Sequence, residues 1–445
     1  MSLRKQGALI FFNFFDGTGT FQGLYKQPKE GEPLSEEAAS VGFAFFDEVV
    51  DIGDFIEVTG ILFTTRTGQK TVEVASWTML TKTLLPLPEK WHGLQDVEER
   101  YRKRYLDILG NPELREMFEL KSTFWKTARE YMQDNGFTEV ETPTLEVTTG
   151  GAEANPFKTY HRDFDLPVYM RVSIGELWQK RLMAAGFART FEIGRAYRNE
   201  GSSPEHVQEF TNMEFYASYM DYEEGMKFTE GLYKAIIKKT FGKTEFTTRG
   251  HTFDIDKEWE KIDYVSHVEK ETGINVITAT EEEMKAKLKE LNVTYAGDNK
   301  ERLTDTLWKY CRKKISGPAW LVNVPKLVSA LSKVNPNNPD LTERCQPILA
   351  GAEVGNGYSE LNDPIDQRER FDLQQILIDR GDEEAMMPEW EFVEMLEHGM
   401  PPTFGYGFGE RLFAFLVDKP IRETQLFPLM KPVDGAKEEK TEAVE

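Results

Sequence analysis

The stretch that decides the fold runs from Phe191 to Tyr222 and reads FEIGRAYRNEGSSPEHVQEFTNMEFYASYMDY. Apolar residues alternate in FEIGRAYRNE and again in FTNMEFYASY, a pattern that predicts two strands joined by a charged loop. The hairpin would place Arg198 and Glu200 at the end of the first strand. Glu214 and Tyr216 would lie together on one face of the second strand. A guanidinium beside carboxylates suits a ligand with an anionic and a cationic group, although a ladder of ion pairs on a solvated sheet would give the same pattern.

The composition is that of a soluble globular protein with two or more domains. Of the 445 residues, 40% are hydrophobic and 29% charged, and no apolar run approaches the roughly 20 residues of a membrane span. The N-terminus has no signal-peptide pattern, and Cys311 and Cys345 are too far apart in sequence to indicate a disulfide framework or a zinc cluster. We therefore expect a cytoplasmic protein. A net charge of −22 argues against a protein that coats nucleic acid nonspecifically, but it does not exclude local contact with nucleic acid.

The pattern changes along the chain predict two domains, a linker and a tail. Residues 1–84 contain short strands with turns at DGTGT and TRTGQ, which is the strand density of a small β-barrel. Residues 85–110 form a linker that begins with LPLPEK, and residues 111–432 mix helices and strands without a repeating βαβ unit. No glycine-rich phosphate loop of the P-loop or Rossmann type is present. The acidic segment 433–445 is poor in apolar residues and is expected to be disordered.

A second cluster of polar residues lies in GAEVGNGYSELNDPIDQRERF, from Gly351 to Phe371. Eight residues of alternating strand character contain Glu353, Asn356, Tyr358 and Glu360. Glycines beside them would let a ligand approach the backbone closely. The alternative is a glycine-rich strand with an acidic edge that faces solvent.

A third cluster, GMPPTFGYGFGERLFAFLVDKP, predicts a glycine-interrupted strand that leads into an apolar helix at Glu410 and Arg411. An arginine at a helix N-terminus opposes the helix dipole, and such a position favours a bound anion. The alternative is that Arg411 only extends to solvent.

In this order, the clusters resemble the three motifs of class II aminoacyl-tRNA synthetases, and specifically those of the lysyl-tRNA synthetase family. The first motif resembles the helix from Glu113 to Gly136 with the following FTEVETPTL, a dimer-interface element in that family. The second resembles FEIGRAYRNE with EFTNMEFY, and the third resembles GFGERL. Features typical of lysyl enzymes are LPLPEKWHGLQDVEERYRKRYLDIL, TTGGAEANPF and GNGYSELNDP. The resemblance covers the whole chain except the acidic tail.

The resemblance implies an α+β fold and a two-step reaction. An N-terminal OB-type β-barrel would bind the anticodon, and an antiparallel sheet flanked by helices would carry catalysis in a homodimer. Lysine and ATP, with Mg²⁺, would form lysyl-adenylate and pyrophosphate. The lysyl group would then pass to tRNA(Lys).

The resemblance also implies roles for individual residues. Catalytic arginines would be Arg198, between the lysine carboxylate and the α-phosphate, and Arg411, at the far end of the triphosphate. Other ATP contacts would come from Glu200, His206, Phe210 and Glu353. The α-amine of lysine would be bound by Gly151 and Glu176, its ε-ammonium by Glu214, Tyr216 and Glu360, and its stem by Asn356 and Tyr358. The metal ligands would be Glu353 and Glu360, and the anticodon contacts Phe11 and Gln22; the alternative for Phe11 is a core position.

The chain departs from the family pattern at several positions. Glu205 stands before His206 where most relatives have arginine, and Gln346 stands where they have an acidic metal ligand. The segment from Pro402 to Arg411 is one residue shorter, and Gln69 replaces a usual glutamate. The resemblance begins inside the barrel, with no counterpart of the first strand before Met1. We expect weaker metal binding and altered contacts to pyrophosphate and anticodon.

Three functions fit these observations. The first is an ATP-dependent lysine–tRNA ligase. The second is a paralogue that makes lysyl-adenylate for a different acceptor, and the third is a catalytically inactive tRNA-binding protein. Aspartyl and asparaginyl ligases are disfavoured because their substrates would want cations where this pocket offers carboxylates.

Overall fold

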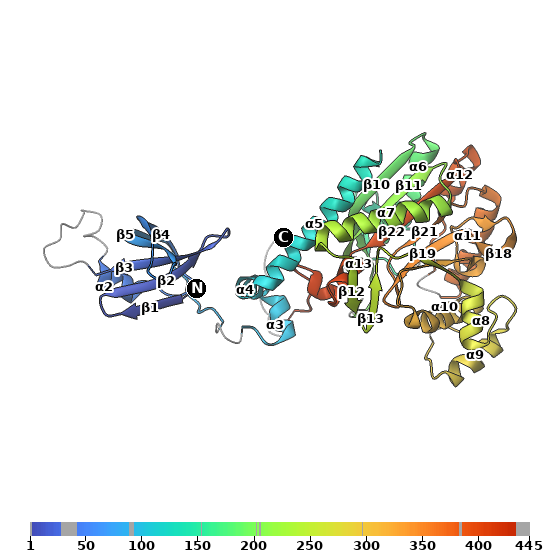
Figure 1. Ribbon diagram of the computed structural model, residues 1–445. Coiled ribbons are helices and arrows are strands. Elements are labelled where there is room, and N and C mark those ends of the chain that lie inside the picture. The colour runs from blue at the N-terminus through green and yellow to red at the C-terminus, as the bar shows by residue number, and fades with distance from the viewer. Residues whose placement is uncertain are drawn as a thin grey trace. The chain divides into compact units, whose positions relative to one another are not determined.

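The computed structural model describes residues 2–27, 42–88, 93–152, 154–201, 203, 206–295, 297–381 and 385–432. The chain divides into two compact units, Met1–Asn111 and Pro112–Glu445 (Figure 1). The predicted acidic tail and Glu205 lie outside the described residues.

The first unit is built on a five-stranded sheet with the order β1-β2-β3-β5-β4. Its pairs are antiparallel except β3 with β5, which run parallel. A buried cluster that includes Ile10, Phe12 and Trp77 covers one face together with helix α2. The elements of this unit are β1 (Ser2–Gln6), β2 (Leu9–Phe15), β3 (Thr20–Lys26), α2 (Phe43–Val49), β4 (Phe55–Thr64), β5 (Lys70–Thr81), α3 (Val97–Arg102) and α4 (Arg104–Gly110).

Strand β1 pairs antiparallel with β2. One element of this unit differs from the strands that the sequence predicts. Helix α2 falls in VGFAFFDEVV, where nearly every residue is apolar and no helical period is visible. Its Phe43 and Phe46 are buried against Tyr25 of the sheet, so tertiary packing accounts for the helix.

The second unit is built on a nine-stranded sheet with the order β14-β15-β19-β21-β22-β11-β10-β6, in which β20 also pairs with β19. The central strands are antiparallel, as predicted, but β14 with β15 and β10 with β6 run parallel, so the sheet is mixed. Its strands are β6 (Thr138–Glu139), β10 (Arg189–Tyr197), β11 (Glu209–Ser218), β14 (Glu260–Asp263), β15 (Ala319–Val322), β19 (Arg344–Leu349), β20 (Ala352–Glu353), β21 (Asn356–Ser359) and β22 (Thr403–Gly409).

Different helices cover the two faces of this sheet (Figure 1). On one face, Phe215 of β11 contacts Phe228 of α7 (Tyr222–Phe241), and Phe408 of β22 contacts Phe124 of α5 (Pro112–Asp134). On the other face, side chains of β11 and β21 join a cluster with helices α6 (Glu176–Ala184), α11 (Pro364–Asp379) and α12 (Trp390–His398). Because strand side chains alternate, residues between the aromatic positions face this second layer.

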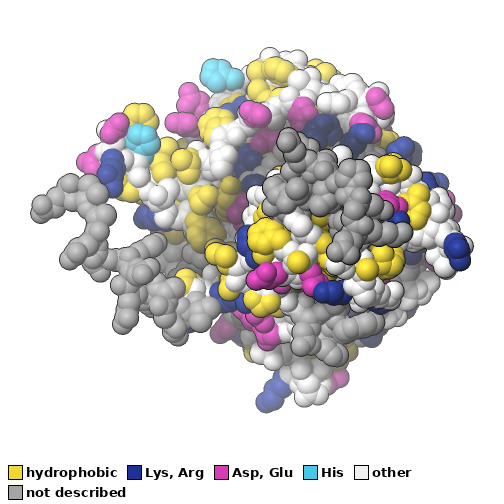
Figure 2. All heavy atoms as spheres, turned by 90° about the vertical axis from the view of Figure 1, so that its left-hand side faces the viewer, with side chains coloured by type: hydrophobic (Ala, Val, Ile, Leu, Met, Phe, Trp, Pro, Cys, Tyr) yellow, Lys and Arg dark blue, Asp and Glu magenta, His cyan; other side chains and the backbone are white. Residues whose placement is uncertain are grey.

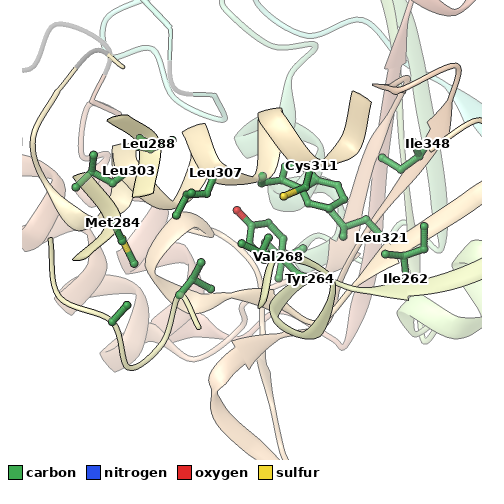
Figure 3. Close-up of a cluster of buried hydrophobic side chains, with 14 of the residues drawn as sticks. Ile262, Tyr264, Val268, Met284, Leu288, Leu303, Leu307, Cys311, Leu321 and Ile348 are labelled. Carbon is green, nitrogen blue, oxygen red and sulfur yellow. The ribbon is translucent and has the colours of Figure 1, made fainter. Parts of the chain in front are cut away.

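A third group of helices closes one end of the sheet. Buried side chains of α8 (Tyr264–Thr272), α9 (Glu281–Glu290) and α10 (Lys300–Cys311) meet Ile262, Leu321 and Ile348 of the strands (Figure 3). The rings of Tyr264 and Trp308 pack at an angle of 31° within this cluster, with their centroids 5.1 Å apart. The cluster therefore fixes α10 beside strands β19 and β20.

The remaining elements connect these layers. They are β7 (Leu145–Glu146), β8 (Lys158–His161), β9 (Leu166–Met170), β12 (Glu245–Thr248), β13 (His251–Asp254), η1 (Arg312–Lys314), β16 (Val324–Pro325), η2 (Lys326–Val328), β17 (Val334–Asn335), β18 (Asn338–Thr342), α13 (Arg411–Leu416) and η3 (Ile421–Thr424).

Charged side chains are mixed on the visible surface. On the face shown in Figure 2, acidic and basic side chains lie among hydrophobic ones. Although the net charge of the chain is −22, the acidic side chains on that face do not form a patch free of basic ones. None of the described helices combines the length and the hydropathy that crossing a membrane requires.

Candidate active site

The candidate site lies on one face of three neighbouring strands. Cross-strand pairs place Tyr216 of β11 beside Gly405 of β22, and Gly405 beside Tyr358 of β21. Two residues further along, Glu214 pairs with Gly407, and Gly407 with Asn356. Directly opposite residues share a face of the sheet, so the polar residues of two predicted clusters meet across a row of glycines.

The glycines of β22 leave room for these side chains. A Cβ atom on Gly405 would overlap Oε1 of Glu360, and one on Gly407 would lie 2.9 Å from Cγ of Glu214. Gly151 is constrained twice, because its φ is +90° and an added Cβ would lie 2.5 Å from Oγ of Ser173. Any larger residue at these positions would displace a site side chain.

A cavity of about 620 Å³ opens above this row. Its walls contain every lysine and ATP contact that the sequence analysis proposed: Gly151, Glu176, Arg198, Glu200, His206, Phe210, Glu214, Tyr216, Glu353, Asn356, Tyr358, Glu360 and Arg411. The structure thus brings the three sequence clusters into one place.

Glu214 is held at the centre of the site. It is 6% exposed, and its Oε1 accepts hydrogen bonds from the backbone N of Ile174 (2.8 Å) and from Asn212 Nδ2 (3.2 Å). The Tyr216 hydroxyl donates to Oε2 at 3.2 Å. Burial and repulsion by Glu176 raise the pKa of Glu214 to about 7.

Glu176 and Glu360 share a buried cation that the sequence analysis did not identify. Lys180 Nζ lies 2.9 Å from Oε1 of Glu176 and 2.6 Å from Oε2 of Glu360. The Tyr358 hydroxyl also donates to Oε1 of Glu176. Although burial opposes its charge, attraction to Glu176 and Glu360 raises the pKa of Lys180. Burial raises the pKa of Glu360 to about 8, and the Lys180 ammonium acts in the opposite direction.

Arg198 and Arg411 also line the cavity. Arg198 follows β10, donates from Nε to the carbonyl of Val172 at 3.2 Å, and places its guanidinium carbon 5.4 Å from the ring centroid of Phe210. Arg411 begins α13 and also lines the cavity. The preceding Glu410 is fully buried, ion-paired with Lys121, and accepts a hydrogen bond from the backbone N of Thr211 at 2.6 Å. Glu410 therefore ties the start of α13 to β11, a role that the sequence analysis missed.

The two predicted metal ligands, Glu353 and Glu360, both line the cavity. Glu353 lines the cavity, receives a hydrogen bond from Trp308 Nε1 at 2.5 Å, and has Gln346 Nε2 3.3 Å from its Oε2. Mg²⁺ bound through phosphates and water needs only one or two protein carboxylates, so Glu353 suits it. Glu360 pairs with the Lys180 ammonium through Oε2, while its Oε1 lies next to Gly405 of the cavity. Among the described residues, no group of three His, Cys, Asp or Glu could hold a metal.

The proposed anticodon contacts belong to the first unit. Phe11 is half-buried and pairs with Leu24, on the face opposite to the core residues Ile10 and Phe12. Gln22 pairs with Asn13 on the same face as Phe11, and its Oε1 accepts a hydrogen bond from Thr71 Oγ1 at 2.9 Å. Phe11 is therefore not part of the buried cluster around Ile10 and Phe12, and its contact with the anticodon stays a prediction.

Comparison with known proteins supplies the family. The sequence model of the family of class II tRNA synthetases (D, K and N) matches residues 96–431. The chain belongs to this family. Among its relatives, a protein of Thermosipho africanus named lysine–tRNA ligase is 40% identical over 99% of this chain and 86% of its own length. The lysine–tRNA ligases of Thermotoga maritima (39% identical, over 99% of this chain) and Halalkalibacterium halodurans (40%, over 98%) also span 86% of their own lengths in the comparison.

Two residues at the cavity, Lys180 and Arg344, were missed in the sequence analysis. Lys180 stands four residues after Glu176, the spacing of an ion pair on one helix face, so a local signal existed. Its contact with Glu360 crosses 180 positions of the chain and has no local signal. Arg344, whose Nε donates to Oδ1 of Asn356 at 2.8 Å, was missed for the same reason.

Proposed function

We propose that the protein is an ATP-dependent lysine–tRNA ligase. The observation that carries this proposal is the gathering of Glu176, Glu214 and Glu360, all nearly inaccessible to solvent, in one cavity with Arg198 and Arg411. A buried carboxylate is costly unless a cation accompanies it. Three of them in one cavity fit an amino acid with two ammonium groups.

Lysine fits the two ends of the acidic region. We propose that Glu176, beside Gly151, binds the α-ammonium, and that Glu214, Tyr216 and Glu360 bind the ε-ammonium. Asn356 and Tyr358 would line the stem between them. Neutral amino acids would leave these carboxylates without partners, which disfavours their binding.

The first chemical step needs positioning more than proton transfer. A carboxylate oxygen of lysine attacks the α-phosphorus of ATP, the bond from that phosphorus to the bridging oxygen breaks, and pyrophosphate leaves. The lysine carboxylate is already ionised at neutral pH, so no general base is needed. Arg198 would hold the carboxylate beside the α-phosphate, and Arg411 would bind the far end of the triphosphate.

The ATP is held by further residues. Phe210 and Glu200 would bind adenine. His206 would contact phosphate, which the negative charge of its neighbour in sequence, Glu205, would repel. Mg²⁺, with Glu353 as its protein carboxylate, would neutralise phosphate charge. In the second step, a hydroxyl of the terminal ribose attacks the lysyl carbonyl, and AMP leaves.

We also propose that the first unit is an OB-type anticodon-binding domain, with residues 1–84 as its extent. Its five strands and the face shared by Phe11 and Gln22 on β2 and β3 support this proposal. A homodimer through the first-motif helix and a cytoplasmic location complete the proposal. Both cysteines are free and buried, as suits a reducing compartment.

Two assays separate this function from the adenylate-forming paralogue. Lysine-dependent exchange of pyrophosphate into ATP measures adenylate formation, and charging of a tRNA(Lys) transcript measures transfer. We expect both activities. Exchange without charging would support the paralogue, and binding of tRNA without either activity would support an inactive homologue.

A further inference from the structure

The buried side chain of Lys180 is the strongest feature that the proposed chemistry does not use. It is 1% exposed, and its Nζ is shared by Glu176 and Glu360. The ring centroids of Tyr358 and Phe392 lie 5.5 and 5.7 Å from this Nζ. An ammonium this deeply buried is stable only with paired carboxylates, and aromatic faces add to its stability.

Lys180 stands behind the cavity wall. Glu176 and Glu360 line the cavity, whereas Lys180 does not appear among its lining residues. Lys180 engages one oxygen of each carboxylate, Oε1 of Glu176 and Oε2 of Glu360. The remaining oxygens lie next to the glycines of the cavity, Oε2 of Glu176 towards Gly151 and Oε1 of Glu360 towards Gly405. One cation thus orients both carboxylates so that each keeps an oxygen for a ligand.

We propose that Lys180 is a positioning residue that fixes the separation of Glu176 and Glu360, and so sets the length of the diamino acid that the pocket accepts. This inference rests on the proposed binding of lysine, with Glu176 at the α-ammonium and Glu360 at the ε-ammonium. A rigid separation discriminates between lysine and ornithine, which is one methylene shorter. Such a difference is worth about 10- to 200-fold in a fitted pocket.

The count of charges agrees with this role. When bound ammonium groups keep all three carboxylates ionised, these carboxylates and Lys180 together carry a charge of −2, which matches the two ammonium groups of lysine. The groups that face Lys180 come from several elements: Glu176 from its own helix, Tyr358 and Glu360 from β21 and the residue after it, and Phe392 from α12. The neighbouring Arg181 pairs instead with Glu389, at the start of α12.

The test compares the dissociation constants of lysine and ornithine in three proteins: wild type, Lys180→Met and Arg181→Met. Arg181→Met is the matched control, because it removes a partly buried, ion-paired cation from the next position of the same helix. We expect Lys180→Met to reduce the ornithine-to-lysine ratio of dissociation constants by about tenfold or more. Arg181→Met should leave the ratio within about twofold of wild type. An unchanged ratio in Lys180→Met would overturn the inference.

A double-mutant cycle separates positioning from general stabilisation. Lys180→Met added to Glu360→Gln should change the ratio by less than about twofold, because Lys180 no longer holds two carboxylates at a fixed separation once Glu360 is neutral. A tenfold change in that background would contradict the inference. This comparison also remains valid if Lys180→Met alone fails to fold, because the double variant leaves fewer unpaired buried charges. Failure of the wild-type protein to bind lysine would instead overturn the proposed function.

Discussion

Glu360 and Gly405 approach each other so closely that the carboxylate occupies the space where a side chain of residue 405 would begin. The glycine stands on β22, and Glu360 follows β21 directly, with its backbone N bonded to the carbonyl of Thr403 at 2.8 Å. The sheet thereby holds the carboxylate of Glu360 at the wall of the cavity, shielded from solvent. Two substitutions examine the two sides of this relationship.

Replacing Gly405 by alanine should displace Glu360 and weaken lysine binding. Overpacking of this kind costs about 1–3 kcal/mol, so we expect the KM for lysine to rise by about tenfold in the exchange assay. Gly110→Ala is the control, because nothing lies within 4 Å of its Cβ position. Unchanged lysine binding in Gly405→Ala would contradict the placement of Glu360 in the pocket.

Replacing Glu360 by glutamine keeps the shape of the side chain and removes its charge. An ammonium that loses a buried partner costs about 2–4 kcal/mol, so the dissociation constant of lysine should rise by about 30-fold or more. Glu397→Gln, at an exposed glutamate paired with Arg368, should leave it unchanged. Calorimetry measures both constants, and equal affinities in the two variants would refute our assignment of the ε-ammonium site.

Lysine binding should strengthen as pH rises from 6 to 8. Burial and repulsion by Glu176 raise the pKa of Glu214 to about 7 in the free protein. A bound ammonium favours the ionised carboxylate, so binding below pH 7 requires loss of a proton, and this requirement disappears above it. Equilibrium titrations across this range measure the slope, and Glu214→Gln should reduce it to the part that Glu360, whose pKa is raised to about 8, contributes. Tighter binding at low pH would be the contradicting result.

Glu146, which does not line the cavity, should make the stability of the folded protein depend on pH. It is buried, accepts a hydrogen bond from Trp178 Nε1 at 2.9 Å, and its Oε2 has no hydrogen-bond partner among the described residues. Burial raises its pKa from 4.5 to about 7. The folded protein then binds more protons than the unfolded chain between these values, so Glu146 lowers stability as pH rises through this window.

We therefore expect Glu146→Gln to stabilise the protein above pH 7 by about 1–3 kcal/mol and to have little effect near pH 4.5. Urea unfolding at several pH values measures the difference. A constant difference between the two proteins at all pH values would show that Glu146 does not titrate in this window.

The sequence predicted those parts of the site whose signals are local. Alternation in residues 191–222 placed Glu214 and Tyr216 on one face, because a strand has a fixed period of two residues. The glycines of GYGFG follow the same period, and the observed pairing shows why. The contact of Lys180 with Glu360 and the burial of Glu410 depend on how distant segments pack, which no local pattern records. Helix α2 was missed because its exposed face also carries apolar residues such as Phe45, which hide the helical spacing of the buried Phe43 and Phe46.

The central claim is tested most directly by the exchange of pyrophosphate into ATP, measured with each of the twenty amino acids in turn. The account predicts exchange with lysine alone, and a loss of about 100-fold or more in Arg198→Ala at unchanged thermal stability, because the guanidinium aligns the carboxylate with the α-phosphate. Exchange that depends equally on aspartate or asparagine, or exchange that persists in Arg198→Ala, would contradict it.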